Sequence, residues 1–514
     1  MPVKSVLFWG AGATRKLGMP TTEDQEEMFK LYFFDEKGFL EKYGDEMGGK
    51  AQKLLYALKE GNNKYNFDMR GLKRYINNFF SECSFRMVDL YNLLDSQISA
   101  GQSFRIYDEN NCATICSADD ALRYRRAILV LLQSVFTIYL KKSACNPEIE
   151  RYKLFFRKLA EIVRREKTNQ LRGFCRDNLD DLKGDDFIFS EIAYISLNWD
   201  FLFLWPMFIA HKELNDENGN YTIVNTRNFI FSEIAYISLI WDFLFLWPMF
   251  IAHKELNDEN RNFAVVNGRN VKLKIFNDFA AYTASRPVEP ESGKNKIWYP
   301  YNATVATHVN DPEHLYDRIV TLIRTYLPHG QTNWLECPVC GKLSMYLGDE
   351  WQLNSQTIAM RSPLLDENPD YKCQHCGQKL TTADSSMLLQ TQLKKKASYI
   401  EEIQRDMRLR LSEAEKIVFV GYSLPADDIE YRSVFVANNA RQKKQIYVVL
   451  YKEEETSKWL KANDPYISKM AGDKSDDTRK TIRRYAALFG EENVWVNLAG
   501  FPAAADSVIE KLTG

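Results

Sequence analysis

A chain of 514 residues has the length for roughly two to four domains. Its composition, 45% hydrophobic and 26% charged, is typical of a globular protein with packed cores. The net charge of −2 argues against nucleic acid or an anionic membrane surface as the main partner.

The amino-terminal stretch MPVKSVLFWGAGAT lacks the features of a signal peptide, and we expect a cytoplasmic location. Two apolar stretches, Ile192–Ala210 and Ile234–Ala252, are each about as long as a membrane span. Each contains an aspartate, Asp200 or Asp242. Because a carboxylate is costly in lipid, a buried strand running into a buried helix is favoured over a membrane hairpin.

The first predicted element is a buried strand at Val3–Trp9, followed by the turn Gly10-Ala11-Gly12. From about Thr22 to Gln170 the sequence reads mainly as helix. Apolar residues recur at helical spacing in Ala121–Ser143 and Ile149–Lys167. We interpret this part as a helical lobe inserted early in the fold.

A tandem duplication follows: Phe187–Asn228 and Phe229–Asn270 align over 42 residues and differ at six positions. Two copies are too few for a solenoid and indicate a local duplication. The first copy has Asn198 where the second has Ile240, which offers no hydrogen bond. We therefore expect the first copy at the ligand edge of the sheet. The reverse arrangement, with Ile240 in the site, predicts an inactive protein.

Further buried strands are predicted at Lys416–Val420, Gln445–Leu450 and Val494–Val496, after a charged helical segment at Ser385–Ala414. Strands that alternate with helices and end in glycine-rich turns predict an α/β fold with an open, Rossmann-like parallel sheet.

Two Cys-x-x-Cys pairs, Cys337 with Cys340 and Cys373 with Cys376, are the strongest local signal. Four thiolates at this spacing predict tetrahedral zinc in a small zinc-ribbon module. Because the protein fills all four positions, the predicted zinc is structural. His375, inside the second pair, is the weaker alternative ligand.

These elements predict five parts of the chain. Residues 1–30 form the first strand and the nucleotide loop, and residues 31–185 form the helical lobe. Residues 186–334 continue the sheet and contain the duplication (187–228 and 229–270), residues 335–380 form the zinc module, and residues 381–514 form the carboxy-terminal part of the sheet.

Four short segments, which begin at Gly10, Ser196, His329 and Gly421, resemble motifs of the sirtuin family and occur in the order found there. Gly10–Thr14, followed by Gly18-Met19-Pro20, resembles the family's first nucleotide loop. Ser196–Asp200 resembles its Asn-x-Asp strand end, and His329-Gly330 resembles its His-Gly segment ahead of the zinc module. Gly421–Pro425, which reads GYSLP, is similar to the late nucleotide loop of sirtuin-like proteins in bacterial anti-phage defence.

The resemblance implies an NAD-consuming enzyme that breaks the nicotinamide–ribose bond, a step that develops oxocarbenium-like charge on the ribose. It gives the catalytic roles to Asn198, whose amide holds a ribose hydroxyl or a water, and to His329, which takes a proton. The resemblance also implies a set of cofactor-binding residues: Gly10, Ala11, Gly12, Thr14, Asp200, Gly421 and Ser423.

The sequence departs from the family in two ways. Thr21-Thr22 stand where the deacylases have Phe-Arg, and the helical lobe is longer than a deacylase needs. Both features favour NAD hydrolysis to nicotinamide and linear or cyclic ADP-ribose over protein deacylation or ADP-ribosyl transfer. A non-catalytic sensor of NAD or ADP-ribose is the other alternative. The resemblance further implies NAD depletion during phage infection, an oligomer, and a regulatory protein partner or phage-derived trigger.

Overall fold

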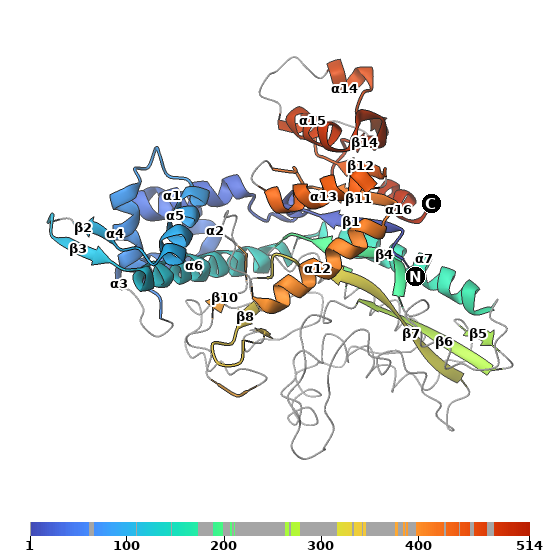
Figure 1. The fold of residues 1–514 in the computed structure, drawn as a ribbon, viewed down its shortest axis with the longest axis horizontal. Helices are drawn as coiled ribbons and strands as arrows, with labels where there is room; N and C mark the ends of the chain where they lie inside the picture. Colours follow the sequence, from blue (N-terminus) through green and yellow to red (C-terminus); the bar gives the residue numbers. More distant parts are fainter. Residues whose placement is uncertain are drawn as a thin grey trace.

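The computed structural model describes both ends of the chain and parts of its middle (Figure 1). With short gaps inside several ranges, the described residues are 2–60, 66–172, 189–198, 206–210, 263–277, 316–345, 376–388, 397–452, 457–469 and 477–514.

A nine-stranded sheet forms the centre of the molecule, in the order β13-β14-β12-β11-β1-β4-β7-β6-β5. The seven inner strands run parallel, and the two edge strands are antiparallel to their neighbours. In chain order the strands are β1 (Ser5–Trp9), β4 (Phe189–Ser196), β5 (Phe263–Val266), β6 (Arg269–Asn277), β7 (Tyr316–Tyr326), β11 (Lys416–Val420), β12 (Gln445–Val449), β13 (Trp459–Lys461) and β14 (Val494–Asn497). The predicted α/β class and parallel sheet are confirmed.

The strand order reverses between β1 and β11. From β1 the chain builds one half of the sheet through β4, β6 and β7, and it then returns to build the other half through β11, β12 and β14. In open parallel sheets, ligands bind outside the carboxyl ends of the strands at such a reversal point. The topology therefore marks the loops after β1 and β11 as the first place to look for a site.

Strand β1 is buried on both faces, which explains its unbroken apolar sequence. Successive side chains of a strand point to opposite faces. The Phe8 ring packs 5.6 Å from that of Phe435 on α13 (Ile429–Arg441), and Trp9 packs 6.1 Å from Tyr152 on α7 (Ile149–Arg172). A helical layer thus covers each face of the sheet.

Other helices complete these two layers. Helix α16 (Ala505–Thr513) packs against α7 and β1, and α15 (Asp477–Phe489) packs against α13 and β14. Helix α12 (Ser398–Glu413) contacts β7 and α13. Two short elements, α14 (Pro465–Lys469) and the 3-10 helix η5 (Glu491–Asn493), connect strands in the carboxy-terminal part.

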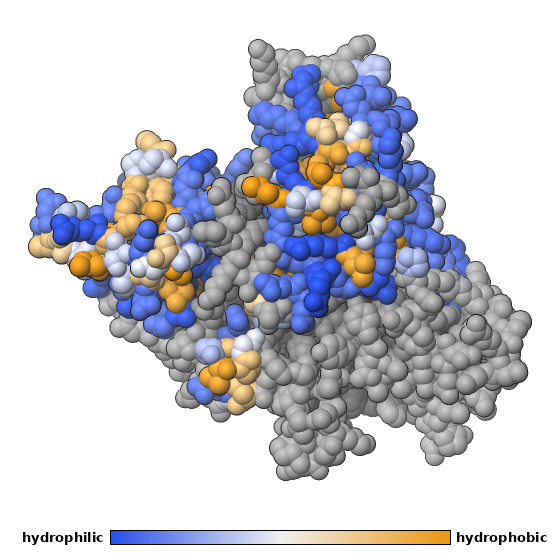
Figure 2. Space-filling view, in the orientation of Figure 1, coloured by the Kyte–Doolittle hydropathy of each residue, from blue (hydrophilic) through white to orange (hydrophobic). Residues whose placement is uncertain are grey.

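The helical lobe lies beside the sheet, coloured blue to teal in Figure 1. Its helices are α1 (Thr22–Phe34), α2 (Glu36–Met47), α3 (Gly49–Glu60), α4 (Met69–Phe79), α5 (Met87–Ala100) and α6 (Ala118–Ala144). It also contains a hairpin of β2 (Phe104–Tyr107) and β3 (Ala113–Cys116), which helical periodicity did not predict. In Figure 2, small apolar areas on the lobe and on the carboxy-terminal part are surrounded by hydrophilic side chains.

The duplicated segment contributes unequally to the described sheet. The first copy provides β4, directly beside β1, so the apolar stretch from Ile192 begins as a buried strand. The second copy provides β5 and the start of β6, whereas 229–262, including Ile240 and the second apolar stretch, lies outside the described residues. Among the helices in the described parts of the chain, none has both the length and the hydropathy to cross a bilayer.

Two glycines let the loops after β1 and β11 lie in direct contact. The Gly12 amide donates to the Gly421 carbonyl at 2.9 Å. Gly421 has a φ of +63°, and a Cβ added there would lie 2.0 Å from the Ala13 nitrogen. A Cβ on Gly10 would lie 2.7 Å from the Gly421 oxygen. Only glycine permits this approach of two backbones.

We expect Gly421→Ala to destabilise the fold more than Gly18→Ala does. Both glycines have positive φ, and a Cβ there costs about 1–2 kcal/mol. A Cβ on Gly18 meets no atom within 4 Å, whereas at Gly421 the overlap with backbone adds about 1–3 kcal/mol. Urea unfolding of the two variants measures the difference. Equal losses would show that the contact between the loops does not require a glycine.

Candidate active site

The predicted site residues follow the carboxyl ends of four neighbouring strands. Trp9, the last residue of β1, pairs with Val420 of β11 on one side and with Ser196 of β4 on the other. In β4, Ile195 pairs with Tyr326, the last residue of β7. The glycine loop, the GYSLP loop, Asn198 and His329 therefore all begin at the same edge of the sheet.

Asn198 is anchored to the first glycine loop through Thr14. Its amide nitrogen Nδ2 donates to Thr14 Oγ1 at 3.3 Å, and Thr14 Oγ1 in turn donates to the Ala11 carbonyl at 3.3 Å. The Asn198 backbone amide donates to Ser196 Oγ. The side chain is 4% exposed, which places it inside the protein.

The oxygen of the Asn198 amide, Oδ1, is buried and has no hydrogen-bond partner within the described part of the chain. Leaving a buried acceptor unsatisfied costs about 1–3 kcal/mol, and such groups in native proteins call for an explanation. Because the hydrogen bond of Nδ2 to Thr14 fixes the amide group, Oδ1 is positioned to accept a hydrogen bond from a ligand hydroxyl or from a water.

His329 lies in the loop after β7 and is 7% exposed. Its ring packs edge-on against Tyr431 of α13, with centroids 5.2 Å apart. Gln404 of α12 donates from Nε2 to the Pro328 carbonyl at 3.0 Å, and the Leu388 amide donates to the His329 carbonyl at 2.9 Å. Three separate segments therefore hold the backbone and ring of this histidine.

The GYSLP loop is held by two tyrosine hydroxyls. Tyr422 donates to Asp428 Oδ2 at 2.7 Å, and Tyr485 of α15 donates to the Tyr422 carbonyl at 2.9 Å. Burial raises the pKa of Tyr422 well above its usual value, with the Asp428 charge adding to the shift. The shift favours the protonated hydroxyl, which is the form that donates to Asp428.

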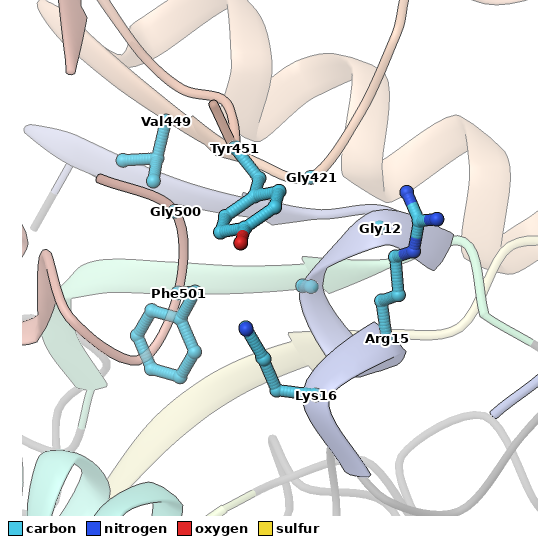
Figure 3. A pocket seen from close by; sticks show the side chains of 9 residues that line it. Gly12, Arg15, Lys16, Gly421, Val449, Tyr451, Gly500 and Phe501 are labelled. Atoms are coloured by element: carbon cyan, nitrogen blue, oxygen red, sulfur yellow. The ribbon is translucent and has the colours of Figure 1, made fainter. Parts of the chain in front are cut away.

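A cavity of about 260 Å³ opens on the β11 side of the glycine loop (Figure 3). Loops after β1, β11, β12 and β14 line it, with Gly12, Lys16, Gly421, Tyr451, Gly500 and Phe501 among the lining residues. Lys16 Nζ lies 4.7 Å from the centre of the Tyr451 ring, while the Arg15 side chain extends away from that ring in Figure 3. A cation and aromatic rings around one space are suited to a flat, anionic ligand.

The predicted cofactor-binding residues have different surroundings. The Gly12 amide is bonded to the Gly421 carbonyl of the other loop, and the Ala13 amide is bonded to the Gly10 carbonyl within its own loop, so neither amide is free for a phosphate in this structure. Gly10 is the N-cap of the 3-10 helix η1 (Ala11–Leu17), which also contains Gly12 and Thr14. Ser423 is exposed, and its carbonyl accepts from Arg484 Nη1 at 3.2 Å. Asp200 lies outside the described residues.

The cysteine module can hold a metal ion. The Sγ atoms of Cys337, Cys340 and Cys376 lie within 4.8 Å of one another, and Cys337 and Cys376 are 3.7 Å apart. Tetrahedral zinc with thiolates at about 2.3 Å separates its sulfurs by about 3.8 Å. Gly341 and Gly377, which follow the two pairs, have φ of +64° and +72° as the predicted tight turns require. Cys373 lies outside the described residues.

The cysteine module is connected to the His329 loop at both of its ends. A three-stranded sheet, β10 (Asp384–Ser385), β8 (Trp334–Glu336) and β9 (Leu343–Met345), carries the module. The Trp334 amide donates to the Gln331 carbonyl at 3.1 Å, and Leu388, just after β10, bonds to His329. A metal in the module would therefore stabilise the loop that carries the histidine.

Sequence reasoning missed several residues around the site. Tyr431, Gln404, Lys16 and Tyr451 carry no motif and no distinctive spacing. Tyr431 and Gln404 come from helices more than 70 residues away from His329 along the chain, so no local signal connects them to it.

We expect Cys340→Ser to lower both metal content and thermal stability, because it removes one thiolate from the cluster. Elemental analysis of the purified variant measures the metal, from about one ion per chain in the parent protein, and calorimetry measures the unfolding temperature. Cys83→Ser, at an exposed cysteine of the lobe, is the control and should change neither. Full metal content in Cys340→Ser would contradict the cluster as a metal site.

Comparison with known proteins assigns no family to this arrangement. No protein-family model matches the chain, and no curated protein matches it.

Proposed function

We propose that the protein is a sirtuin-like NAD hydrolase that cleaves the nicotinamide–ribose bond to give nicotinamide and ADP-ribose, in linear or cyclic form. The observation that carries the proposal is the buried Asn198 Oδ1, which has no hydrogen-bond partner among the described residues. Its side chain is fixed through Thr14 to the glycine loop where the strand order reverses. In this proposal the sheet is a Rossmann-like nucleotide fold, and the cysteine module is a structural zinc ribbon.

The glycine loop lies between the cavity and Asn198, so one dinucleotide could extend along it from the one to the other. Its Gly12–Ala13 side lines the cavity, and its Thr14 side contacts Asn198. The cavity is smaller than the roughly 300–1,000 Å³ of sites that hold a whole drug-sized ligand. It fits the adenosine half, with Tyr451 and Phe501 beside the base and Lys16 near a phosphate. The nicotinamide half would then lie beyond Thr14, towards Asn198.

The proposed chemistry uses an acceptor and a base. The bond between ribose C1′ and the pyridine nitrogen breaks, and its electron pair leaves with nicotinamide. A water attacks the oxocarbenium-like C1′. Asn198 Oδ1 accepts a hydrogen bond from that water or from a ribose hydroxyl and fixes its position. His329 takes the proton that the water releases, which completes ADP-ribose.

The same proposal includes regulation. An enzyme that depletes NAD must be silent until it is needed, so we infer a trigger, either a regulatory protein or a phage-derived molecule, and a cytoplasmic oligomer. Deacylation and ADP-ribosyl transfer would need a second substrate as the acceptor in place of water. The sensor alternative would bind NAD or ADP-ribose and leave it intact.

We expect Asn198→Ala to lower nicotinamide release from NAD by at least about 100-fold, since it removes the positioned acceptor. His329→Ala should lower it by about 10²–10⁴-fold, the usual contribution of a general base. Chromatography of nicotinamide measures release by the full-length protein, alone and in lysate of phage-infected cells. Circular dichroism and metal content check the fold of each variant.

Ile240→Ala is the matched control, because it alters the equivalent position of the second copy. Ile240→Ala should leave nicotinamide release unchanged if only the first copy contributes a residue to the site. NAD that binds but stays intact in every condition would favour the sensor. Unchanged release in Asn198→Ala would contradict the role proposed for its Oδ1 atom.

A further inference from the structure

Gln331 is a buried amide that the proposed chemistry does not use. Its side chain is 0% exposed, and neither Oε1 nor Nε2 has a hydrogen-bond partner within the described part of the chain. The equally buried Gln97 shows the usual arrangement: its Oε1 accepts from Tyr75, and its Nε2 donates to the Cys116 and Ser117 carbonyls. A native protein rarely leaves both ends of a buried amide unsatisfied.

The position of Gln331 connects it to the proposed site. It lies two residues after His329 in the loop beyond β7, and its backbone carbonyl already closes this loop by accepting from the Trp334 amide. Asn198, whose Oδ1 has no partner in the ranges that the structure describes, follows the neighbouring strand β4, where Ile195 pairs with Tyr326 at the end of β7. Unsatisfied amide atoms therefore follow two adjacent strands at one edge of the sheet.

We propose that Gln331 determines specificity by reading the carboxamide of the nicotinamide ring; this inference rests on the proposed function. A carboxamide presents one carbonyl acceptor and an NH₂ donor, which complement the Nε2 donor and the Oε1 acceptor of glutamine. Nicotinic acid adenine dinucleotide carries a carboxylate there, which only accepts. The second oxygen of this carboxylate would lie against Gln331 Oε1 with no proton between the two acceptors. The site would therefore bind NAD more tightly than nicotinic acid adenine dinucleotide.

The test is equilibrium binding of NAD and of nicotinic acid adenine dinucleotide to the full-length protein, measured by calorimetry. The parent protein should prefer NAD by at least about tenfold, since a site built around a hydrogen bond rejects the analogue that cannot form it. Gln331→Met keeps an unbranched side chain of similar length and removes both polar atoms. It should bring the ratio of the two affinities to about one.

Unfolding temperatures separate a ligand-binding role from a structural one. Gln331→Met removes unsatisfied atoms, so the unliganded variant should unfold at the parent temperature or above it. Gln97→Met, the matched control, removes satisfied hydrogen bonds and should unfold earlier with the affinity ratio unchanged. An unchanged ratio in Gln331→Met, or a loss of stability like that of Gln97→Met, would overturn the inference. NAD that binds with a Gln331-dependent ratio but is never cleaved would overturn only the proposed hydrolysis, and no NAD binding would overturn both.

Discussion

The hydrogen bond from the Gly12 amide to the Gly421 carbonyl joins the two halves of the sheet at the point where strand order reverses. The contact depends on the absence of side chains, because a Cβ on Gly421 or Gly10 would overlap the opposite backbone. With the loops in contact, one side of the glycine loop lines the cavity and its other side meets Asn198 through Thr14. The cavity and Asn198 are both placed relative to this contact.

Two buried amide side chains, in the loops after β4 and β7, are not fully hydrogen-bonded within the part of the chain that the structure describes. The buried Asn198 Oδ1 and both ends of the Gln331 side chain lack partners in the described residues. In the helical lobe, the buried amide of Gln97 is paired at both ends. Stability alone would favour apolar side chains or paired ones. Proteins tolerate such losses where a ligand completes the hydrogen bonds, which is the role that we propose for both residues.

The histidine loop shows how distant parts of the fold contribute to one position. His329 follows β7, packs on Tyr431 of α13, and is bonded through its carbonyl to Leu388 beyond the cysteine module. Gln404 of α12 holds the preceding residue. The module's three clustered cysteines thus lie on the same stretch of chain that carries the imidazole. A structural metal would therefore affect the site without touching a substrate.

The sequence by itself determined the elements whose signal is local. Unbroken apolar runs predicted β1, β11, β12 and β14, and helical spacing predicted α6 and α7. Paired cysteines predicted a cluster that can hold a metal. Each of these patterns reflects the burial or chemistry of neighbouring residues. Only the tertiary structure decided which atoms are left without partners and which helices hold His329. It also decided the cavity between Lys16 and Tyr451 and the hairpin in the lobe. Those features arise where segments far apart in sequence meet, and residue spacing carries no information about such meetings.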